Sequence, residues 1–342
     1  MASLRKVAIN GFGRIGRIFL RQALKDPELS VVAINDMGDL ENLSYLFAHD
    51  TVYGKFEGDV KVDPKARALI INGRTIAVFE EKEPGKLPWS QLGVDVVVES
   101  TGVFDSFEKA KAHVEVAGAR HAVISAPAKD DDGVFGKTVL MGVNEHDLGS
   151  VPVTSNASCT TNACAAVIRV LSESLGFESA LLNTTHAYTA TQSIVDGPVK
   201  GSDFRRGRAA AENMAPSSTG AAKAVGRVIP EAKGNFDGIA VRVPLVAGSL
   251  ADITFVAKRT TTAEEVNEIL RTAEREPRWQ GLLKVSDEQL VSSDIVGEPY
   301  AAIVDAPSTR VVGGKLVKVL SWYDNEWGYV STLIKHVKRI PL

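Results

Sequence analysis

A glycine-rich turn near the start of the chain constrains the fold more than any other feature. Gly11, Gly13 and Gly16 form the pattern G-x-G-x-x-G, between an apolar run at 7–10 and a helical stretch that reaches about residue 25. In a strand–turn–helix unit, the first glycine permits the tight turn and the second lets the backbone approach a pyrophosphate. The third lets the helix pack on the strand, while the helix N-terminus offers partial positive charge to the phosphates. The pattern predicts a dinucleotide-binding unit.

An acidic residue supports this interpretation. The next apolar run, 31–34, ends at Asn35 and Asp36, and Asp36 lies 20 residues after Gly16. A carboxylate there binds the ribose hydroxyls of an adenosine and repels a 2′-phosphate, which favours NAD over NADP. The alternative is a structural turn followed by an exposed loop acid. The order strand, turn, helix, strand and acid favours cofactor binding.

The rest of the chain predicts two domains that differ in secondary structure. Strand-like runs at 94–98 and 122–125, with one helix expected over 107–117, indicate a parallel, doubly wound sheet in the first half. The runs 238–245 and 249–258 are rich in β-branched residues and indicate an antiparallel sheet in the second half. Helices are expected at 158–175, 220–228, 262–275 and 325–339, the last suited to docking on a neighbouring domain, and 187–216 is expected to be a long functional loop.

Bulk properties exclude several classes of protein. The 342 residues carry a formal net charge of −3, so neither nucleic acid nor an anionic membrane is indicated as a partner. No apolar run approaches the roughly 20 residues of a membrane span, and the start has no secretory apolar core, so we expect a cytoplasmic protein. The two cysteines, Cys159 and Cys164, are five positions apart, which argues against a disulfide and against a shared metal site.

Cys159 is the candidate nucleophile. It lies in the run Ser-Cys-Thr-Thr-Asn at the start of a predicted helix, where free N–H groups and the helix dipole stabilise a thiolate and lower its pKa. Cys164 lies in an apolar stretch and is typical of a core residue. On these residues alone, a small buried side chain is an equally good interpretation of Cys159.

His186 is the best candidate for a base among six histidines. It ends a strand-like run and is followed by Tyr188, Thr189, Thr191 and Gln192. An imidazole can take a thiol proton and later move the hydroxyl proton of a hemithioacetal. The other five are more typical of surface or hydrogen-bonded structural histidines, and sequence distance cannot pair His186 with Cys159.

Several groups suit an anionic substrate. Arg242 lies inside an apolar strand, where an arginine is costly unless it meets an anion or a carboxylate. Ligand binding and a structural ion pair stay equally open for it. The remaining candidates are hydroxyl, glycine and arginine positions in polar segments and at a helix start, namely Thr160, Thr189, Thr191, Thr219, Gly220, Arg205 and Arg206.

Five motifs, in the same order and nearly end to end, closely resemble those of phosphorylating glyceraldehyde-3-phosphate dehydrogenases. They are 10–17 (NGFGRIGR), 157–162 (ASCTTN), 186–189 (HAYT), 218–225 (STGAAKAV) and 321–326 (SWYDNE). The resemblance implies an α/β fold, with a Rossmann domain over 1–155 completed by the C-terminal helix 323–342. It also implies an α+β catalytic domain over 156–322 with a mostly antiparallel sheet, and a homotetramer in which the loop 187–216 lies beside a neighbouring subunit's cofactor.

The resemblance also implies a reaction and its residues. Cys159 forms a hemithioacetal with D-glyceraldehyde 3-phosphate, His186 acts as base, hydride passes to NAD, and inorganic phosphate releases the thioester as 1,3-bisphosphoglycerate, in glycolysis or gluconeogenesis. The implied substrate-phosphate site is Thr189, Thr191 and Arg242, and the implied inorganic-phosphate site is Ser158, Thr160, Thr219 and Gly220. The implied cofactor residues are Gly11, Gly13, Arg14, Ile15, Gly16, Asp36, Thr101, Ser125 and Asn325, with no metal.

Three departures from the family pattern and three alternatives accompany this prediction. The second cysteine is one position later than usual, with Ala163 in its place, and 243–249 replaces a Val-Pro-Thr-Pro-Asn run, which puts contacts beside Arg242 in doubt. Met37 and Pro198 offer a 2′-phosphate no hydrogen bond, which again favours NAD.

The alternatives are an erythrose-4-phosphate dehydrogenase, which typically lacks the Tyr188-Thr189 pair, an NADP-using biosynthetic relative, and a non-catalytic scaffold of the same fold.

Overall fold

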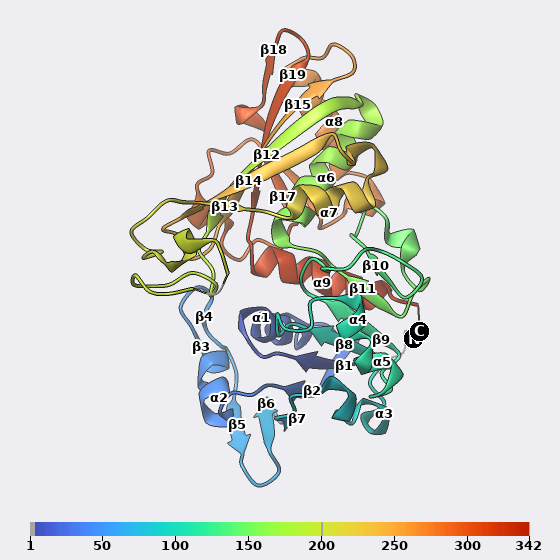
Figure 1. The fold of residues 1–342 in the computed structure, drawn as a ribbon, viewed down its shortest axis with the longest axis vertical. Helices are drawn as coiled ribbons and strands as arrows, with labels where there is room; N and C mark the ends of the chain where they lie inside the picture. The colour runs from blue at the N-terminus through green and yellow to red at the C-terminus, as the bar shows by residue number, and fades with distance from the viewer. Residues whose placement is uncertain (1–3, 200, 342) are drawn as a thin grey trace. The chain divides into compact units, whose positions relative to one another are not determined.

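The computed structural model describes residues 4–199 and 201–341, and the chain divides into two compact units (Figure 1). The first unit is Met1–Leu140, Asn144–Ala157 and Leu333–Leu342, and the second is Met141–Val143 and Ser158–Thr332. Residues 1–3 and 342 of the predicted domain ranges, and Lys200 of the predicted loop, lie outside the described residues.

A mixed sheet organises the first unit. Among the described residues its strand order is β10-β11-β9-β8-β1-β2-β7-β6-β5, and neighbours run parallel from β10 to β7. The predicted parallel sheet is therefore confirmed, while the antiparallel edge of β7, β6 and β5 was not predicted. The strands are β1 Arg5–Asn10, β2 Leu29–Asn35, β5 Val60–Asp63, β6 Ala68–Ile71, β7 Arg74–Phe79, β8 Val96–Glu99, β9 His121–Ile124, β10 Gly136–Thr138 and β11 Val153–Ser155, with β3 His49–Asp50 and β4 Gly54–Lys55 as a separate pair.

The helices of this unit bury apolar residues against the sheet. Ile18, Phe19 and Leu20 of α1 are fully buried, as expected where a helix covers a parallel sheet. The helices are α1 Arg14–Ala23, α2 Leu40–Ala48, α3 Trp89–Leu92, α4 Phe107–Ala110 and α5 Ala112–Glu115. The prediction of one helix over 107–117 is wrong, because the hydrogen-bond ladder tightens at Lys111, whose carbonyl accepts from Val114 N–H, and separates α4 from α5.

A second, mostly antiparallel sheet organises the other unit. Its order among the described residues is β13-β14-β12-β15-β19-β17-β16, with β18 also paired to β19. The predicted strands 238–245 and 249–258 are β14 and β15, but they are not neighbours, since β12 lies between them, parallel to β14 and antiparallel to β15. The strands are β12 Phe177–Ala187, β13 Ala215–Ser218, β14 Phe236–Val243, β15 Ser249–Ala257, β16 Leu283–Ser286, β17 Ala302–Asp305, β18 Arg310–Val312 and β19 Leu316–Tyr323.

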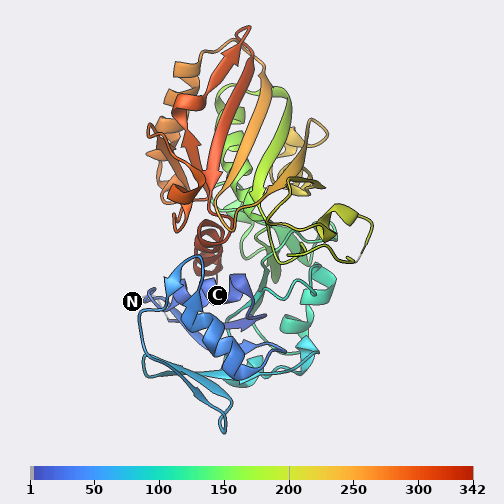
Figure 2. The same cartoon turned by 90° about the vertical axis from the view of Figure 1, so that its left-hand side faces the viewer.

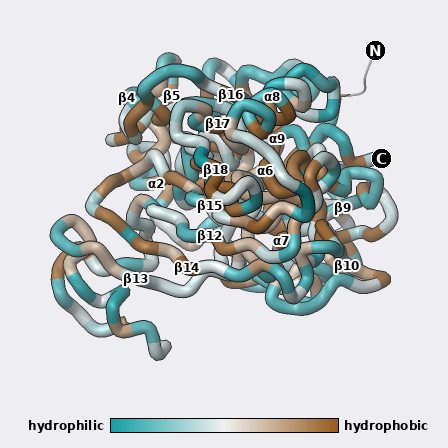
Figure 3. The backbone as a smooth tube through the Cα atoms, turned by 90° about the horizontal axis from the view of Figure 1, so that it is seen from above, coloured by the Kyte–Doolittle hydropathy of each residue, from teal (hydrophilic) through white to brown (hydrophobic). Residues whose placement is uncertain are grey.

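Three helices, α6 Cys159–Ser174, α7 Ala221–Val228 and α8 Ala263–Glu274, cover one face of this sheet (Figure 1). The predicted helices 158–175, 220–228 and 262–275 are thereby confirmed to within a residue or two. Most of α6 is buried, including the whole apolar run 163–168, and brown tube of hydrophobic residues lies around its label in Figure 3. The opposite face is seen in Figure 2, and no helix of the described residues covers it; β15 alternates accordingly between buried and half-buried residues.

The chain ends in helix α9, Trp327–Arg339, as the amphipathic pattern predicts. The last turns belong to the first unit, where Arg5 Nη2 donates to Ile340 O at 2.8 Å and Lys338 Nζ pairs with Asp26 at 2.9 Å. Within the described residues, no helix is both long and apolar enough to cross a membrane.

Two buried histidines join β9, β11 and α9 within the first unit. The Thr154 hydroxyl lies 2.9 Å from His121 Nε2 and 2.8 Å from His336 Nε2, and His336 Nδ1 lies 3.1 Å from Asn156 Oδ1. His336 Nδ1–H donates to the amide oxygen, so Nε2 accepts from the hydroxyl and the hydroxyl accepts from His121. This arrangement requires the His336 ring to be neutral, because its Nε2 must accept.

We predict that this cluster makes stability fall in mild acid. Burial lowers the pKa of His121 to about 4 and that of His336 to about 3, below the ordinary value near 6.5. As pH falls below about 6.5 the unfolded chain takes up protons that the folded chain refuses, which costs about 2 kcal/mol per histidine at pH 5. The urea midpoint should therefore be lower at pH 5 than at pH 7.5.

A variant comparison isolates the cause. His336→Gln should be less stable than the parent at pH 7.5 but should lose less stability between pH 7.5 and 5, because one titrating group is gone. His146→Gln is the control, since the His146 side chain is 79% exposed and should leave the pH slope unchanged. An unaltered slope in His336→Gln would contradict this assignment.

Candidate active site

The start of α6 presents Cys159 on the helix-covered side of the sheet. Ala157 has a positive φ of 51°, and Ser158 is the N-cap, its hydroxyl accepting from Thr161 N–H at 3.0 Å. Cys159 is the first helical residue and is partly exposed, whereas Cys164, one turn further, is buried. The turn and cap thus fix the direction in which the sulfur points.

His186 meets this sulfur from β12. Its Nε2 lies 3.4 Å from Cys159 Sγ, although the two residues are 27 positions apart in the chain. His186 is next to last in β12 and lies on the buried face of the sheet, which α6 covers. The structure therefore makes the pairing that the sequence could not.

Arg242 lies beside His186 on the neighbouring strand. The two residues are register partners in β12 and β14, and Arg242 Nη1 lies 2.7 Å from His186 Nδ1 and 3.1 Å from Ala187 O. Among the described residues Arg242 Nε is buried without a hydrogen-bond partner, and the guanidinium has no carboxylate as its partner. An unpaired buried donor of this kind fits an anionic ligand better than a structural ion pair.

The imidazole has two possible arrangements because its Nδ1 has two neighbours. A guanidinium only donates, so a hydrogen bond from Arg242 to Nδ1 puts the ring proton on Nε2, facing the sulfur. Ala187 O lies 2.6 Å from Nδ1, and a carbonyl only accepts. When Nδ1–H donates to this carbonyl, Nε2 is free to take a proton from the thiol. The position of Arg242 therefore decides whether His186 can act as a base.

The pKa directions correct one expectation. The predicted lowering of the Cys159 pKa is wrong, because burial raises the pKa of this thiol, and the Arg242 charge and the Thr160 N–H oppose that effect only in part. Burial, followed by the Arg242 charge, lowers the pKa of His186 to about 3. Burial also raises the pKa of Cys164, to about 12. Burial thus disfavours the charged form of each group, the thiolate of Cys159 and the imidazolium of His186.

Tyr323 is a site residue that the sequence analysis missed. Its hydroxyl lies 2.9 Å from Thr160 Oγ1 and 2.8 Å from Thr184 Oγ1, and its ring meets the His186 ring edge-on at 5.9 Å between centroids. Burial raises the pKa of this phenol, so it is neutral. The available signal was a tyrosine at the end of a strand, which is common in any sheet.

The other predicted anion-binding residues form two further groups. Thr189 and Thr191 have their hydroxyls 3.0 Å apart, and Arg206 Nη1 donates to Thr191 Oγ1 at 2.9 Å. Gly220 is the N-cap of α7, and Thr219 Oγ1 accepts from Ala221 N–H. Within the described residues, no hydrogen bond joins Thr219 or Gly220 to Cys159 or His186.

The glycine turn of the first unit has the form expected for a dinucleotide site. Gly11 has φ +94°, and a Cβ there would lie 2.5 Å from Thr101 N, so only glycine fits. A Cβ on Gly13 would meet open space, and Gly13 begins α1 without any side-chain cap. An uncapped helix start with open space beside it fits a pyrophosphate, which can accept from the first amides.

The remaining predicted cofactor residues belong to the first unit, except Asn325. Asp36 Oδ2 accepts from Phe12 N–H at 2.6 Å, and Arg14 pairs with the buried Asp50 at 2.5 Å. Ile15 lies in the first turn of α1, Thr101 and Ser125 follow the carboxyl ends of β8 and β9, and Asn325 belongs to the second unit, where it accepts from Ser249 Oγ. No cluster among the described residues has the ligands to hold a metal ion.

Comparisons with known proteins agree with this chemistry. Residues 158–325 match the family model "Glyceraldehyde 3-phosphate dehydrogenase, C-terminal domain", and residues 5–107 match "Glyceraldehyde 3-phosphate dehydrogenase, NAD binding domain". The chain is 47% identical over 336 residues to the glyceraldehyde-3-phosphate dehydrogenase of Clostridium pasteurianum, covering 97% of each chain. It is 48% identical over 331 residues to glyceraldehyde-3-phosphate dehydrogenase 1 of Bacillus subtilis, covering 96% of each. The chain belongs to the glyceraldehyde-3-phosphate dehydrogenase family.

Proposed function

We propose that this chain oxidises D-glyceraldehyde 3-phosphate with NAD and inorganic phosphate to 1,3-bisphosphoglycerate, as a step of glycolysis or gluconeogenesis. The observation that carries the proposal is the 3.4 Å contact between Cys159 Sγ and His186 Nε2, beside Arg242, in a chain of this family. The catalytic residues are Cys159 and His186.

The first step forms a bond between sulfur and carbon. In the tautomer whose Nδ1–H donates to Ala187 O, His186 Nε2 accepts the Cys159 proton, while the Arg242 guanidinium binds the phosphate of the substrate. The thiolate attacks the aldehyde carbon, and the carbonyl oxygen takes the proton from His186 to give a hemithioacetal. This proton transfer to His186 produces the thiolate that burial by itself disfavours.

The second step breaks the carbon–hydrogen bond, and the third breaks the carbon–sulfur bond. His186 takes the hydroxyl proton of the hemithioacetal as the carbon loses hydride, which leaves a thioester on Cys159. NAD, when bound, supplies the two-electron acceptor for this hydride. An oxygen of inorganic phosphate then attacks the thioester carbon, and Cys159 leaves as thiolate, so that the product is the acyl phosphate.

We assign the binding residues on the basis of the family motifs and of their donor groups. Arg242, Thr189 and Thr191 bind the phosphate of the substrate, and Ser158, Thr160, Thr219 and Gly220 bind inorganic phosphate. The residues that would hold NAD are Gly11, Gly13, Arg14, Ile15, Gly16, Asp36, Thr101, Ser125 and Asn325. Asp36 keeps the preference for NAD, because a 2′-phosphate would meet its carboxylate.

We further propose a homotetramer in the cytoplasm. The helix-free face of the second sheet exposes Leu181 and Ile239, which are 64% and 55% exposed, and apolar patches of this kind favour association. Membership of the family favours a second copy of the chain as the partner that covers this face. A cytoplasmic location suits a reactive free thiol, because that compartment keeps thiols reduced.

The first test of this function measures NADH formation. The purified protein should reduce NAD with glyceraldehyde 3-phosphate only when inorganic phosphate is present, and Cys159→Ser should abolish this activity while NAD still binds. Cys164→Ser is the matched control and should stay active, since the Cys164 side chain, further along α6, is buried. Preference for erythrose 4-phosphate, or activity in Cys159→Ser, would refute the proposal.

The second test concerns Arg242. In Arg242→Gln the KM for glyceraldehyde 3-phosphate should rise about 10- to 100-fold, as expected for loss of a hydrogen bond between charged groups. Oxidation of glyceraldehyde, which lacks the phosphate, should change far less. Arg205→Gln is the control, because the Arg205 side chain is 62% exposed and pairs with Asp203. Equal losses with both aldehydes would remove Arg242 from the phosphate site.

The third test concerns the exposed sheet face. Leu181→Glu should lower the sedimentation mass below that of a tetramer, because a charge placed in an apolar interface loses its hydration. Val134→Glu, at a side chain that is 98% exposed in the first unit, should leave the mass unchanged. A parent protein that sediments as a monomer would contradict the proposed assembly.

A further inference from the structure

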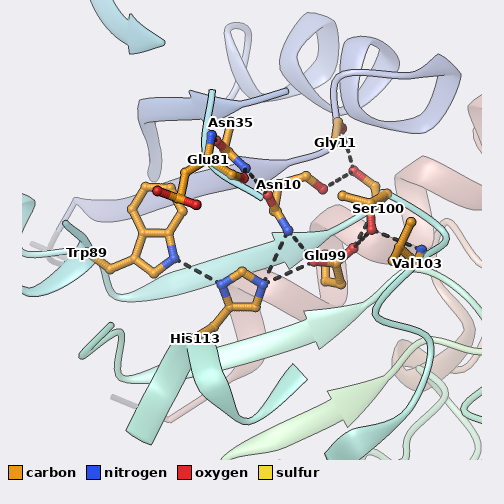
Figure 4. A network of polar contacts seen from close by, with 10 residues as sticks. Asn10, Gly11, Asn35, Glu81, Trp89, Glu99, Ser100, Val103 and His113 are labelled. Atoms are coloured by element: carbon orange, nitrogen blue, oxygen red, sulfur yellow. Dashed lines mark hydrogen bonds and ion pairs between the residues drawn. The ribbon is translucent and has the colours of Figure 1, made fainter. Parts of the chain in front are cut away.

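A buried polar network lies directly beneath the glycine turn of the first unit (Figure 4). Asn35, Asn10 and Glu99 stand side by side at the carboxyl ends of β2, β1 and β8, as register partners. All three are at most 4% exposed, and His113 of α5, which joins them, is fully buried. The function described above uses none of these four side chains.

The direction of the hydrogen bonds is fixed from one end by a backbone amide. Glu81 N–H can only donate, so Asn35 Oδ1 accepts from it at 2.8 Å. Asn35 Nδ2 then donates to Asn10 Oδ1 at 2.7 Å, and Asn10 Nδ2 is left to donate to Glu99 Oε2 at 2.5 Å. Glu99 must therefore accept at this oxygen.

The other end is fixed by an indole. Trp89 Nε1–H can only donate, and it does so to His113 Nδ1 at 3.0 Å. The ring proton is then on His113 Nε2, which lies 3.0 Å from Glu99 Oε2 and donates to it. His113 is neutral in this arrangement, because a second ring proton would face the indole.

The second oxygen of Glu99 accepts from the turn after β8. Thr101 N–H donates to Oε1 at 2.8 Å, and the Thr101 hydroxyl donates to the same oxygen at 2.5 Å. Glu99 therefore accepts four hydrogen bonds, two at each oxygen, which is the pattern of a carboxylate. All four donors are neutral, and a buried charge held this way is costly for stability alone.

The network joins two turns that touch each other. Asn10 immediately precedes Gly11, and the Ser100 hydroxyl donates to Gly11 O at 2.7 Å. The Thr101 hydroxyl also accepts from Val103 N–H at 3.0 Å, which shapes the rest of the second turn. The Glu99 carboxylate binds both Asn10, the residue before the glycine turn, and Thr101, the residue that the Gly11 backbone approaches.

We propose that Glu99 is a positioning residue for NAD, because its four accepted hydrogen bonds hold the turns after β1 and β8 as one rigid edge. This inference rests on the proposed function, in which Gly11 and Thr101 line the cofactor. The carboxylate acts through these turns and does not touch the reacting atoms. His113 and Trp89 fix its charge and orientation.

The test is the dissociation constant for NAD, measured by fluorescence titration. Glu99→Gln keeps the shape but turns an NH₂ group toward two donors in either orientation, so the Kd for NAD should rise about 10- to 100-fold. At saturating NAD, kcat and the KM for the aldehyde should stay within about threefold of the parent values. A purely structural defect would not separate these quantities.

Two His113 variants provide a second measurement that does not depend on the folding of Glu99→Gln. His113→Gln can give its NH₂ to Glu99 and its oxygen to Trp89, so it should keep the parent Kd. His113→Leu removes both partners and should raise the Kd as Glu99→Gln does. His121→Gln is the control for loss of a buried histidine in the first unit. His121 lies at the amino end of β9, so this variant should lose stability without any change in the Kd for NAD.

The outcomes separate the two proposals. A parent protein that binds NAD, with equal Kd values in His113→Gln and His113→Leu or an unchanged Kd in folded Glu99→Gln, overturns the positioning role alone. A parent protein that does not bind NAD overturns the proposed function, and the positioning role with it.

Discussion

The need to satisfy buried polar groups where parallel strands end is the constraint on which both units depend. At the ends of β12 and β14 it brings His186 and Arg242 together as register partners, with Cys159 above them. At the ends of β2, β1 and β8 it lines up Asn35, Asn10 and Glu99. In each unit the backbone stops pairing at this edge, so side chains must supply the remaining hydrogen bonds. The same edge is where ligands bind in such sheets.

The two edges treat charge in opposite ways. Around Cys159 burial disfavours the thiolate and the imidazolium, since it raises the thiol pKa and lowers the imidazole pKa, and the nearby Arg242 Nε is buried without a hydrogen-bond partner among the described residues. Around Glu99 a full negative charge is buried and satisfied by four neutral donors. In the proposed reaction the protonation of the first arrangement changes, whereas the hydrogen bonds of the second hold its charge in place. A reacting site and a rigid support require these different properties.

Much of the fold and of the site was predictable. The glycine turn, the two sheets and the helices beginning at Cys159 and Ala263 follow from local patterns, since capping, apolar periodicity and turn chemistry depend on neighbours in the chain. The break between α4 and α5 and the antiparallel edge of β5, β6 and β7 were not predictable, because short elements depend on what they pack against. Tyr323 was missed for the same reason, since only the folded sheet brings its hydroxyl between Thr160 and Thr184.

The sequence by itself determined the chemistry that is available: a cysteine at a helix start, a histidine after a strand, a glycine turn and an acid at dinucleotide spacing. Tertiary structure decided which of these groups meet and in which charge state. It paired Cys159 with His186, placed Arg242 against the imidazole, and raised the thiol pKa that the helix start alone would lower. It also turned His113, an unremarkable histidine in the sequence, into a neutral donor to a buried carboxylate. The physical reason is that burial and hydrogen-bond partners come from strands distant in the chain, which no local pattern encodes.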